Sequence, residues 1–354
     1  MFEIEGGAPA CSRLLAMIAR LMRFVLLLEC CLALAMAWAV APIIEAAWPL
    51  TRNGASWAPA AAMTLAILGG LLGVLVLRLL LSANNFFIAW RHRDTAHDLA
   101  HAAAAPTSLH AGAWLHMFFN EFAASMLTSS WTMPFKTFSR RLFHDSPCPP
   151  VLLIHGYGCN SGYWHSMSQA LSSARISHLA LDLEPVFTDI DAYVPQLQGA
   201  VEALCRETGQ RRVIIVAHSM GGLVARAWMR CHGDGRLAIA ITLGTPHHGT
   251  VLANLGHGVN ARQMRRQRRT AGSQGAASGW LQQLHGTEQQ GLRSRIVSLR
   301  SFHDNIVVPQ SAAILHGADN LMLSGIGHVA LGSHPAVQRW VVGTVRSMEL
   351  IHPT

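Results

Sequence analysis

Two long apolar stretches dominate the first quarter of the chain. Residues 24–44 are interrupted by Glu29, and residues 59–81 by Thr64 and Arg78. Because about 20 residues cross a hydrocarbon core, each stretch predicts a transmembrane helix. A signal peptide is the alternative for the first stretch, but its apolar part is too long and no clear small-residue cleavage site precedes the second. A buried helical hairpin is the other alternative, which the scarcity of polar interruptions disfavours.

Charged residues around the two stretches predict their orientation. Basic residues lie on the outer sides of the pair, at Arg13, Arg20, Arg23, Arg78, Arg91 and Arg93, whereas the connecting loop holds Arg52 and Glu45. Because basic residues prefer the cytoplasmic side, both ends are predicted to be cytoplasmic. Glu29 could be a functional carboxylate within its span. It lies within snorkelling reach of the interface, however, and we assign it no role.

A helical linker is expected over residues 96–148, between the membrane anchor (residues 1–95) and a globular domain (residues 149–354). Residues 96–106 are rich in Ala and His and fit a helix end or a linker. Residues 114–135 are rich in Trp, Phe and Met. They fit an amphipathic helix on a membrane surface or, the interpretation we favour, a helix packed on the domain. The cluster Ser146-Pro-Cys-Pro-Pro150 breaks regular structure, so we place the start of a sheet just after it.

Short apolar runs then alternate with helix-compatible segments. The predicted strands are residues 151–155, 178–183, 213–217, 238–243, 295–299 and 321–323. The predicted helices are residues 163–173, 193–207, 223–231 and 335–348. This alternation predicts an α/β fold with a mainly parallel sheet covered on both faces. Residues 252–293 interrupt the sheet, and so long an insert is usually a lid or disordered.

Composition strengthens the membrane prediction and localises the charge. Of the 354 residues, 51% are hydrophobic and 13% charged, against roughly a quarter charged in a typical soluble domain. The net charge of +8 comes mostly from a run in the insert, at Arg262, Arg265, Arg266, Arg268 and Arg269. Such a run suits anionic lipid headgroups or a solvated loop, and no nucleic-acid-binding signature is present. The seven cysteines, odd in number and without zinc-like spacing, predict no disulfide framework and favour a reducing compartment.

The candidate chemistry centres on Ser219. The apolar run from Val213 ends in Ala217-His218-Ser219-Met220-Gly221, and a helix-compatible run follows. A sharp strand-to-helix turn with small flanking residues, in which a serine hydroxyl projects from the sheet, is a nucleophile elbow. Ala217 stands where the usual pattern has Gly, and it is still small enough for the turn.

A serine hydroxyl needs a base, usually a histidine, and a carboxylate that holds the histidine in one tautomer. In this class of sheet the chain order is Ser, acid, His. Asp304 directly follows the predicted strand 295–299, and His328 follows the strand 321–323. Asp319 is a rival acid but would start the last strand, at the wrong end of the sheet. His303 is a rival base whose adjacency to Asp304 makes the required geometry awkward.

An oxyanion intermediate needs backbone N–H donors fixed in advance. The sequence His155-Gly156-Tyr157-Gly158 follows the first predicted strand, and its glycines allow a turn that directs the Tyr157 amide toward the nucleophile. The second predicted donor is the amide of Met220, at a helix N-terminus whose dipole favours negative charge.

In combination these motifs resemble the lipase and esterase group of α/β-hydrolases. The resemblance covers the chain from about Pro149 to its end, and includes the segment Leu243-Gly-Thr-Pro-His-His-Gly-Thr250, which is similar to one common in bacterial triacylglycerol lipases. It implies hydrolysis of acyl esters through an acyl-enzyme, with no cofactor. Adjacent histidines seldom share a metal, so His247 and His248 are expected to shape the substrate pocket, together with His155 and His218.

The sequence therefore predicts a membrane-anchored serine hydrolase of hydrophobic acyl esters or lipids, in a bacterial inner membrane with its catalytic domain on the cytoplasmic side. A hydrolase fold that has lost activity and serves as a membrane scaffold or transport-associated protein is the alternative from another class. A thioesterase or amidase is the alternative with the same triad.

Overall fold

The computed structural model describes residues 17–47, 58–94, 109–267 and 275–348. It contains two compact units, one formed by Arg20–Phe87 and the other by Ile88–Thr354 with Met1–Ala19. The predicted linker at residues 96–106, the loop residue Arg52, and Arg13, Arg268 and Arg269 lie outside the described residues.

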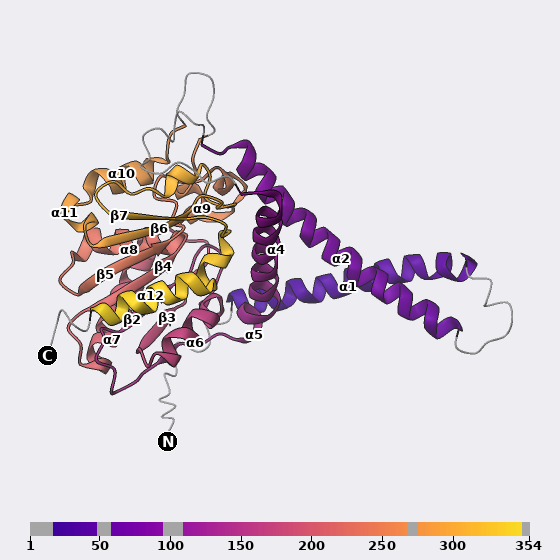
Figure 1. Cartoon of the computed structure of the whole chain (residues 1–354), viewed down its shortest axis with the longest axis horizontal. Helices are drawn as coiled ribbons and strands as arrows, with labels where there is room; N and C mark the ends of the chain where they lie inside the picture. Colours follow the sequence, from indigo (N-terminus) through magenta and orange to yellow (C-terminus); the bar gives the residue numbers. More distant parts are fainter. Residues whose placement is uncertain (1–16, 48–57, 95–108, 268–274, 349–354) are drawn as a thin grey trace. The chain divides into compact units, whose positions relative to one another are not determined.

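The first unit contains two long helices, α1 (Met17–Ala47) and α2 (Ala58–Arg91), shown in Figure 1. Both are long and apolar enough to cross a membrane, over Met17–Ile44 and Ala60–Arg91. Little of either helix is buried, and large apolar side chains such as Leu34, Trp38 and Leu80 are exposed. A hairpin in the core of a soluble protein would instead bury these side chains.

Small residues allow the two helices to approach closely. Ala37, Ala41 and Ala66 are buried together, and a Cβ placed on Gly70 would lie 2.1 Å from the carbonyl oxygen of Ala33. Close backbone contact of this kind is the usual packing mode of helices in lipid. Glu29, which the sequence analysis gave no role, accepts a hydrogen bond from Arg78 Nε at 2.8 Å. Pairing is the favourable state for two opposite charges on apolar helices.

The second unit is built on a seven-stranded sheet in the order β1-β3-β2-β4-β5-β6-β7. The strands are β1 (Arg140–Arg141), β2 (Val151–Ile154), β3 (His178–Leu181), β4 (Val213–His218), β5 (Leu237–Leu243), β6 (Ile296–Ser301) and β7 (Asp319–Leu323). All neighbours pair in parallel except β1, which runs antiparallel to β3. The sheet therefore begins before residue 151, where it was predicted to start. The sequence did not predict β1 because its two exposed arginines carry no apolar strand pattern.

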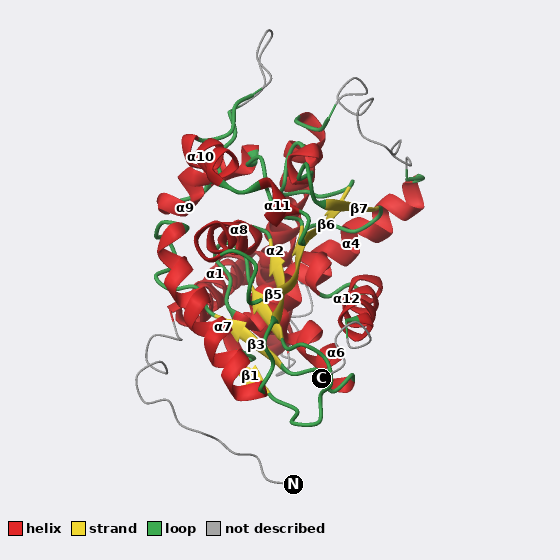
Figure 2. Ribbon diagram, turned by 90° about the vertical axis from the view of Figure 1, so that its left-hand side faces the viewer, coloured by secondary structure: helices red, strands yellow, loops and turns green. Residues whose placement is uncertain are grey.

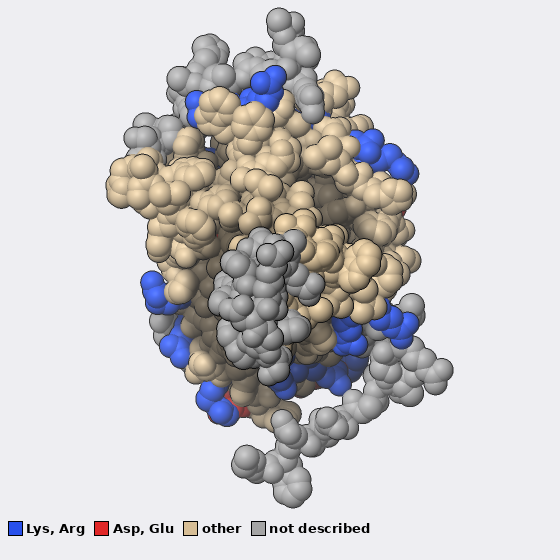
Figure 3. Space-filling model, turned by 90° about the vertical axis from the view of Figure 1, so that its right-hand side faces the viewer, with Lys and Arg blue, Asp and Glu red and all other residues tan. Residues whose placement is uncertain are grey.

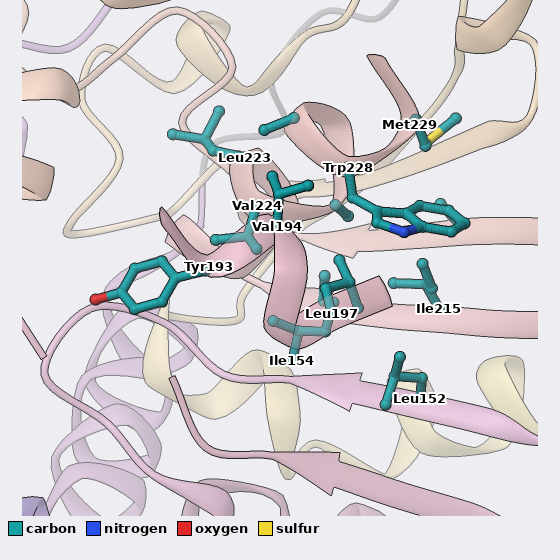
Figure 4. Packing of buried hydrophobic residues seen from close by; sticks show 14 of the residues in the cluster. Leu152, Ile154, Tyr193, Val194, Leu197, Ile215, Leu223, Val224, Trp228 and Met229 are labelled. Carbon is teal, nitrogen blue, oxygen red and sulfur yellow. The ribbon is translucent and has the colours of Figure 1, made fainter. Parts of the chain in front are cut away.

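Helices cover both faces of the sheet, as predicted (Figure 2). Helices α7 (Val194–Thr208) and α8 (Met220–His232) pack on the face that presents Leu152 and Ile215. Figure 4 shows this core, in which Leu197 and Trp228 lie beside the strand residue Ile215. Helices α6 (His165–Ser173) and α12 (Pro335–Ser347) pack on the opposite face. Successive strand residues alternate between the two cores, so every central strand is buried on both sides.

Helix α4 (Ala111–Leu127) continues through a π-helical turn, η2 (Thr128–Thr132), into α5 (Met133–Phe135). It buries Met117, Phe118 and Glu121 and contacts η7 (Val329–Gly332) near the C-terminus. The favoured interpretation of residues 114–135, a helix packed on the domain, is therefore confirmed. Its outer face keeps large apolar side chains exposed, among them Phe119 and Leu127.

The remaining short 3-10 helices connect the strands: η3 (Ser161–Trp164), η4 (Asp191–Tyr193), η5 (Val251–Leu255) and η6 (Gln310–Ala313). The insert at residues 252–293 is helical where it is described, with α9 (Gly258–Gln263), α10 (Gly279–Thr287) and α11 (Gln290–Arg293). Glu288 of the insert forms a fully buried ion pair with Arg226 of α8 at 2.6 Å, and Arg293 also donates to it at 2.8 Å. This ion pair joins the insert to helix α8.

On the face shown in Figure 3, Lys and Arg side chains recur while Asp and Glu are scarce. The cysteines at positions 30, 31, 148, 159, 205 and 231 are free thiols, and Cys11 lies outside the described residues.

Replacing Arg226 with Met should lower the free energy of unfolding by about 3–5 kcal/mol, because Glu288 would lose one of its two buried partners. Burial raises the pKa of Glu288, but Arg226 and Arg293 outweigh it and the net shift is downward. The carboxylate therefore stabilises the fold above its unfolded pKa and loses this contribution as the pH falls through the lowered folded value. Urea unfolding of the full chain in detergent, at neutral pH and at about pH 4, measures both effects.

Arg230→Met is the matched control on the same helix. Arg230 pairs with Asp191 at 2.8 Å, but both side chains are partly exposed, so its loss should cost no more than about 1 kcal/mol. Equal losses in the two variants would contradict the role given to the buried pair.

Candidate active site

Ser219 occupies a strained turn between β4 and α8. Its φ of 53° lies in the left-handed region that residues other than glycine avoid. Its amide donates to the carbonyl of Leu243 at 2.9 Å, and its carbonyl accepts from Thr245 Oγ1 at 2.9 Å. The strand-to-helix turn predicted from the sequence is confirmed, and the neighbouring strand end holds it in place.

The small residues after Ser219 are required by close packing. A Cβ on Gly221 would lie 2.5 Å from the carbonyl oxygen of Ile154, and one on Gly222 would lie 2.0 Å from Thr245 Oγ1. The first turn of α8 therefore lies directly against the ends of β2 and β5. Any side chain there would push the helix away from the sheet.

His328 and Asp304 meet behind the ends of β7 and β6. His328 Nδ1 and Asp304 Oδ2 are 2.8 Å apart, and both side chains are buried. The other carboxylate oxygen, Oδ1, accepts the amides of Ile306 at 2.8 Å and Val307 at 2.7 Å. A carboxylate only accepts, so Nδ1 carries the proton and Nε2 is left as the basic nitrogen.

The same edge of the sheet brings this pair to the Ser219 turn. The His218 ring lies 4.5 Å from the His328 ring, centroid to centroid, and His218 Nε2 donates to the His328 carbonyl at 3.1 Å. A Cβ on Gly244 would lie 3.0 Å from Asp304 Oδ2 and 3.1 Å from His328 Nδ1. Within the described chain no hydrogen bond joins the Ser219 hydroxyl to His328. Such a bond is often long before a substrate binds.

The two rival residues lie elsewhere. Asp319 is the exposed first residue of β7, at the opposite end of that strand from His328. His303 Nδ1 lies 3.1 Å from the amide of Gly325, which donates to it. The placement of Asp319 agrees with the reason for which it was set aside.

Charge around His328 opposes the effect of its burial. Burial lowers the pKa of the imidazole, whereas the Asp304 carboxylate and, more weakly, the Glu121 carboxylate raise it, and the net shift is upward. The imidazolium that forms when this histidine accepts a proton is thus stabilised by two neighbouring negative charges.

The loop after β2 lies against Ser219. A Cβ on Gly156 would lie 3.0 Å from the Ser219 Cβ. His155 Nε2 accepts the Leu183 amide at 3.0 Å, so its Nδ1 donates to the Gly156 carbonyl at 2.9 Å. In a trans peptide the next N–H points opposite to that carbonyl, so the Tyr157 amide points away from the His155 ring. Met220, the first residue of α8, has an amide for which the helix offers no acceptor.

Four histidines are expected to shape a substrate pocket, and three of them are buried in the structure. His155, His218 and His247 are buried, with exposures of 2%, 3% and 0%. Most of their ring nitrogens contact protein groups, Arg226 and Ser298 in the case of His247. His218 Nδ1 is buried without a hydrogen-bond partner. Burial lowers the pKa of His247 and His218 well below the ordinary value. His155 and His218 hydrogen-bond to backbone groups near the turn, whereas His247 contacts buried side chains.

His248 is the more accessible of the adjacent pair and stacks on His285, with ring centroids 4.6 Å apart. Burial and the neighbouring His285 lower the pKa of His248 to about 3. Among the described residues no group of His, Cys, Asp and Glu side chains is arranged to hold a metal ion.

Several residues around His328 were not found from the sequence. Asn305 Oδ1 accepts the His328 amide at 3.0 Å, and Tyr163 donates to the Val329 carbonyl at 3.1 Å. The Glu121 carboxylate accepts the amides of Val329 and Ala330, both at 2.9 Å. The one available signal for Glu121 was an acidic residue within an aromatic-rich helix, and nothing in the sequence related it to a histidine 207 positions later.

With this geometry established, the chain can be compared with known proteins. The sequence model of the Alpha/beta hydrolase family matches residues 151–346, which is more than half of the chain. The chain belongs to this family. Its N-terminal segment, including α1, α2 and α4, precedes the matched region.

Curated relatives match a shorter part. A triacylglycerol lipase of Pseudomonas fragi is 30% identical over 110 residues, or 30% of this chain and 37% of the lipase. A non-heme chloroperoxidase, CPO-A1 of Kitasatospora aureofaciens, is 32% identical over 102 residues, or 27% of this chain and 36% of the relative. The chain thus spans little more than a third of the length of these relatives.

Two solved structures are similar to part of the chain. The mature lipase BlEst2 of Bacillus licheniformis has a TM-score of 0.47 and 21% identity, covering 57% of this chain and 93% of that one. Lipase B of Aspergillus fumigatus has a TM-score of 0.46 and 16% identity, covering 72% and 63%.

Gly222→Ala should destabilise the chain by about 1–3 kcal/mol, because its Cβ would overlap Thr245 Oγ1 and displace the Ser219 carbonyl. Gly199→Ala is the control. Gly199 lies inside α7 with open space around it, so Ala there should stabilise by about 0.5–1 kcal/mol. Chemical unfolding of both variants tests this. A neutral Gly222→Ala would show that the turn is not tightly packed.

Proposed function

We propose that the chain is a membrane-anchored serine hydrolase that cleaves carboxylic esters with hydrophobic acyl groups through an acyl-enzyme. The observation that carries the proposal is the buried Asp304–His328 hydrogen bond, beside a serine in a strained turn at the carboxyl edge of a parallel sheet. Membership of the α/β-hydrolase family and the partial match to a triacylglycerol lipase support the choice of ester chemistry.

In the proposed reaction Ser219 Oγ attacks the acyl carbon while His328 Nε2 takes its proton. Asp304 holds the imidazole in the required tautomer and stabilises its positive charge. The amides of Tyr157 and Met220 donate to the oxyanion. His328 then returns the proton to the leaving alcohol, which departs and leaves Ser219 acylated. Water, deprotonated by His328, attacks the acyl group and releases the carboxylic acid and the free serine.

Two features support a hydrophobic or lipid substrate. The helices α1 and α2 are long and apolar enough to cross a membrane, and the basic residues around them favour a domain on the cytoplasmic side. The insert contacts the loop after β2, which carries the proposed oxyanion donor Tyr157. The Tyr157 hydroxyl donates to the His257 carbonyl at 2.7 Å and accepts from the His257 amide at 2.9 Å. An insert in this position can serve as a lid over the bound acyl group.

A fluorophosphonate probe tests the nucleophile directly. The full chain in detergent should be labelled at Ser219, and labelling should vanish in Ser219→Ala. Hydrolysis of p-nitrophenyl esters should fall at least about 10³-fold in Ser219→Ala and in His328→Ala, because both act in the same step. A folded wild-type chain that resists the probe and hydrolyses no ester would support the inactive scaffold instead. Faster turnover of thioesters or amides than of matched esters would favour those alternatives.

The pH dependence follows from the charge around His328. The base must be neutral to accept a proton, so kcat/KM should fall as the pH decreases through its pKa. Because Asp304 and Glu121 raise that pKa above the ordinary value of 6.5, the acid limb should lie above 6.5. Stopped-flow or steady-state rates measured from pH 5 to 9, about two pH units on each side of neutrality, locate this acid limb. A midpoint well below 6.5 would contradict the assigned base.

A further inference from the structure

Glu121 is a buried carboxylate with an unusual position. It lies on α4, which precedes the family-matched residues 151–346, and its exposure is 1%. Its two oxygens accept the amides of Val329 and Ala330, both at 2.9 Å. These amides open the 3-10 helix η7, directly after His328. A carboxylate that bridges two orphan amides at a helix start both satisfies them and interacts favourably with their dipole.

Gly327 shows how closely this carboxylate approaches the histidine loop. A Cβ on Gly327 would lie 2.5 Å from the Glu121 carboxyl carbon and 2.5 Å from its Oε2. The φ of Gly327 is not in the left-handed region, so its backbone conformation is open to other residues. The glycine is required because Glu121 occupies the space that a side chain would fill.

The remaining polar groups of the loop are also held. Asn305 accepts the amide of His328, and His218 donates to its carbonyl. Tyr163 donates to the Val329 carbonyl and accepts the Gly332 amide. All of these partners belong to the family-matched region, whereas Glu121 comes from the segment that precedes it. The backbone on both sides of the proposed base is thus fixed from several directions, and one of them is α4.

We propose that Glu121 is a positioning residue of the active site, which fixes the backbone that carries His328 and sets the electrostatic environment of its imidazolium. This inference rests on the proposed function, because it assigns a role relative to His328 as the base. It gives α4, which follows the predicted anchor along the chain, a part in the hydrolytic machinery.

The charge of Glu121 should change the pH dependence of the reaction, which packing alone would not do. The titratable groups that face His328 are Asp304 from the loop after β6, His218 at the end of β4, Tyr163 of η3 and Glu121 of α4. Burial raises the pKa of Glu121 and outweighs its two amide donors and His328, so the net shift is upward. The Glu121 charge in turn raises the pKa of His328. Removing it should therefore move the acid limb of kcat/KM to lower pH.

Glu121→Gln is the primary test, because it keeps the shape and removes the charge and one acceptor. We expect kcat on a soluble p-nitrophenyl ester to fall by about 10- to 100-fold with little change in KM, as for a catalytic group displaced by a fraction of an ångström. The acid limb should move downward and fluorophosphonate labelling should slow. Gly327→Ala, which pushes Glu121 away from the opposite side of the contact, should give a similar loss of kcat.

Two controls on α4 separate positioning from general stability. Met117→Ala removes a buried apolar side chain one turn before Glu121. It should lower the denaturant concentration at the unfolding midpoint without moving the acid limb. Asn120→Ala changes an exposed neighbour and should leave kcat, stability and the pH profile unchanged.

The outcomes distinguish this proposal from the proposed function. A wild-type chain that is labelled at Ser219, with Glu121→Gln matching its kcat and acid limb, overturns the role of Glu121 alone. So does Met117→Ala reproducing both changes, since the effect would then be one of packing. A wild-type chain with no labelling and no esterase activity overturns the triad, and this inference with it. Should Glu121→Gln fail to fold, Gly327→Ala decides by the same two readouts.

Discussion

The backbone of Ser219 is the constraint on which the rest of the site depends. A non-glycine residue at a φ of 53° costs about 1–3 kcal/mol, and such strain persists only where the surroundings over-determine it. Here the surroundings are the Leu243 carbonyl, the Thr245 hydroxyl and the contacts that exclude any side chain at Gly221 and Gly222. The tight packing of three strand ends therefore holds Ser219 in its strained conformation.

Buried polar groups are costly when unpaired, and at this edge of the sheet nearly all have partners. Asp304 uses one oxygen for two backbone amides and the other for His328. The buried His155 is paired in the same way. His155 uses both ring nitrogens on the backbone of neighbouring loops. A residue type that is prominent in a motif can therefore serve the geometry of the site without contacting the substrate.

The segment that precedes the family-matched region contributes to this edge at two points. Besides Glu121, Asp94 lies three residues after α2 and accepts the amide of Ser311 in η6 at 2.7 Å. The neighbouring Gln310 in turn donates to the Asp304 carbonyl at 3.0 Å.

The sequence alone determined the elements and their order. Strand-length apolar runs, the breaker cluster before residue 151 and the small residues after Ser219 are local properties, so the parallel sheet, its covering helices and the elbow could all be predicted. The positions of Asp304 and His328 after their strands followed from the same logic. It is the family match that confirms the fold, while the triad remains a proposal from geometry.

Only the tertiary structure decided the contacts between distant positions. The pairing of Glu29 with Arg78, the addition of β1 to the sheet, the burial of His155, His218 and His247, and the arrival of Glu121 beside His328 each join residues that no local pattern relates. A hydrophobic period specifies which face of an element is buried. It does not specify which polar group on another element will meet it, because that depends on how the packed elements bring their ends together.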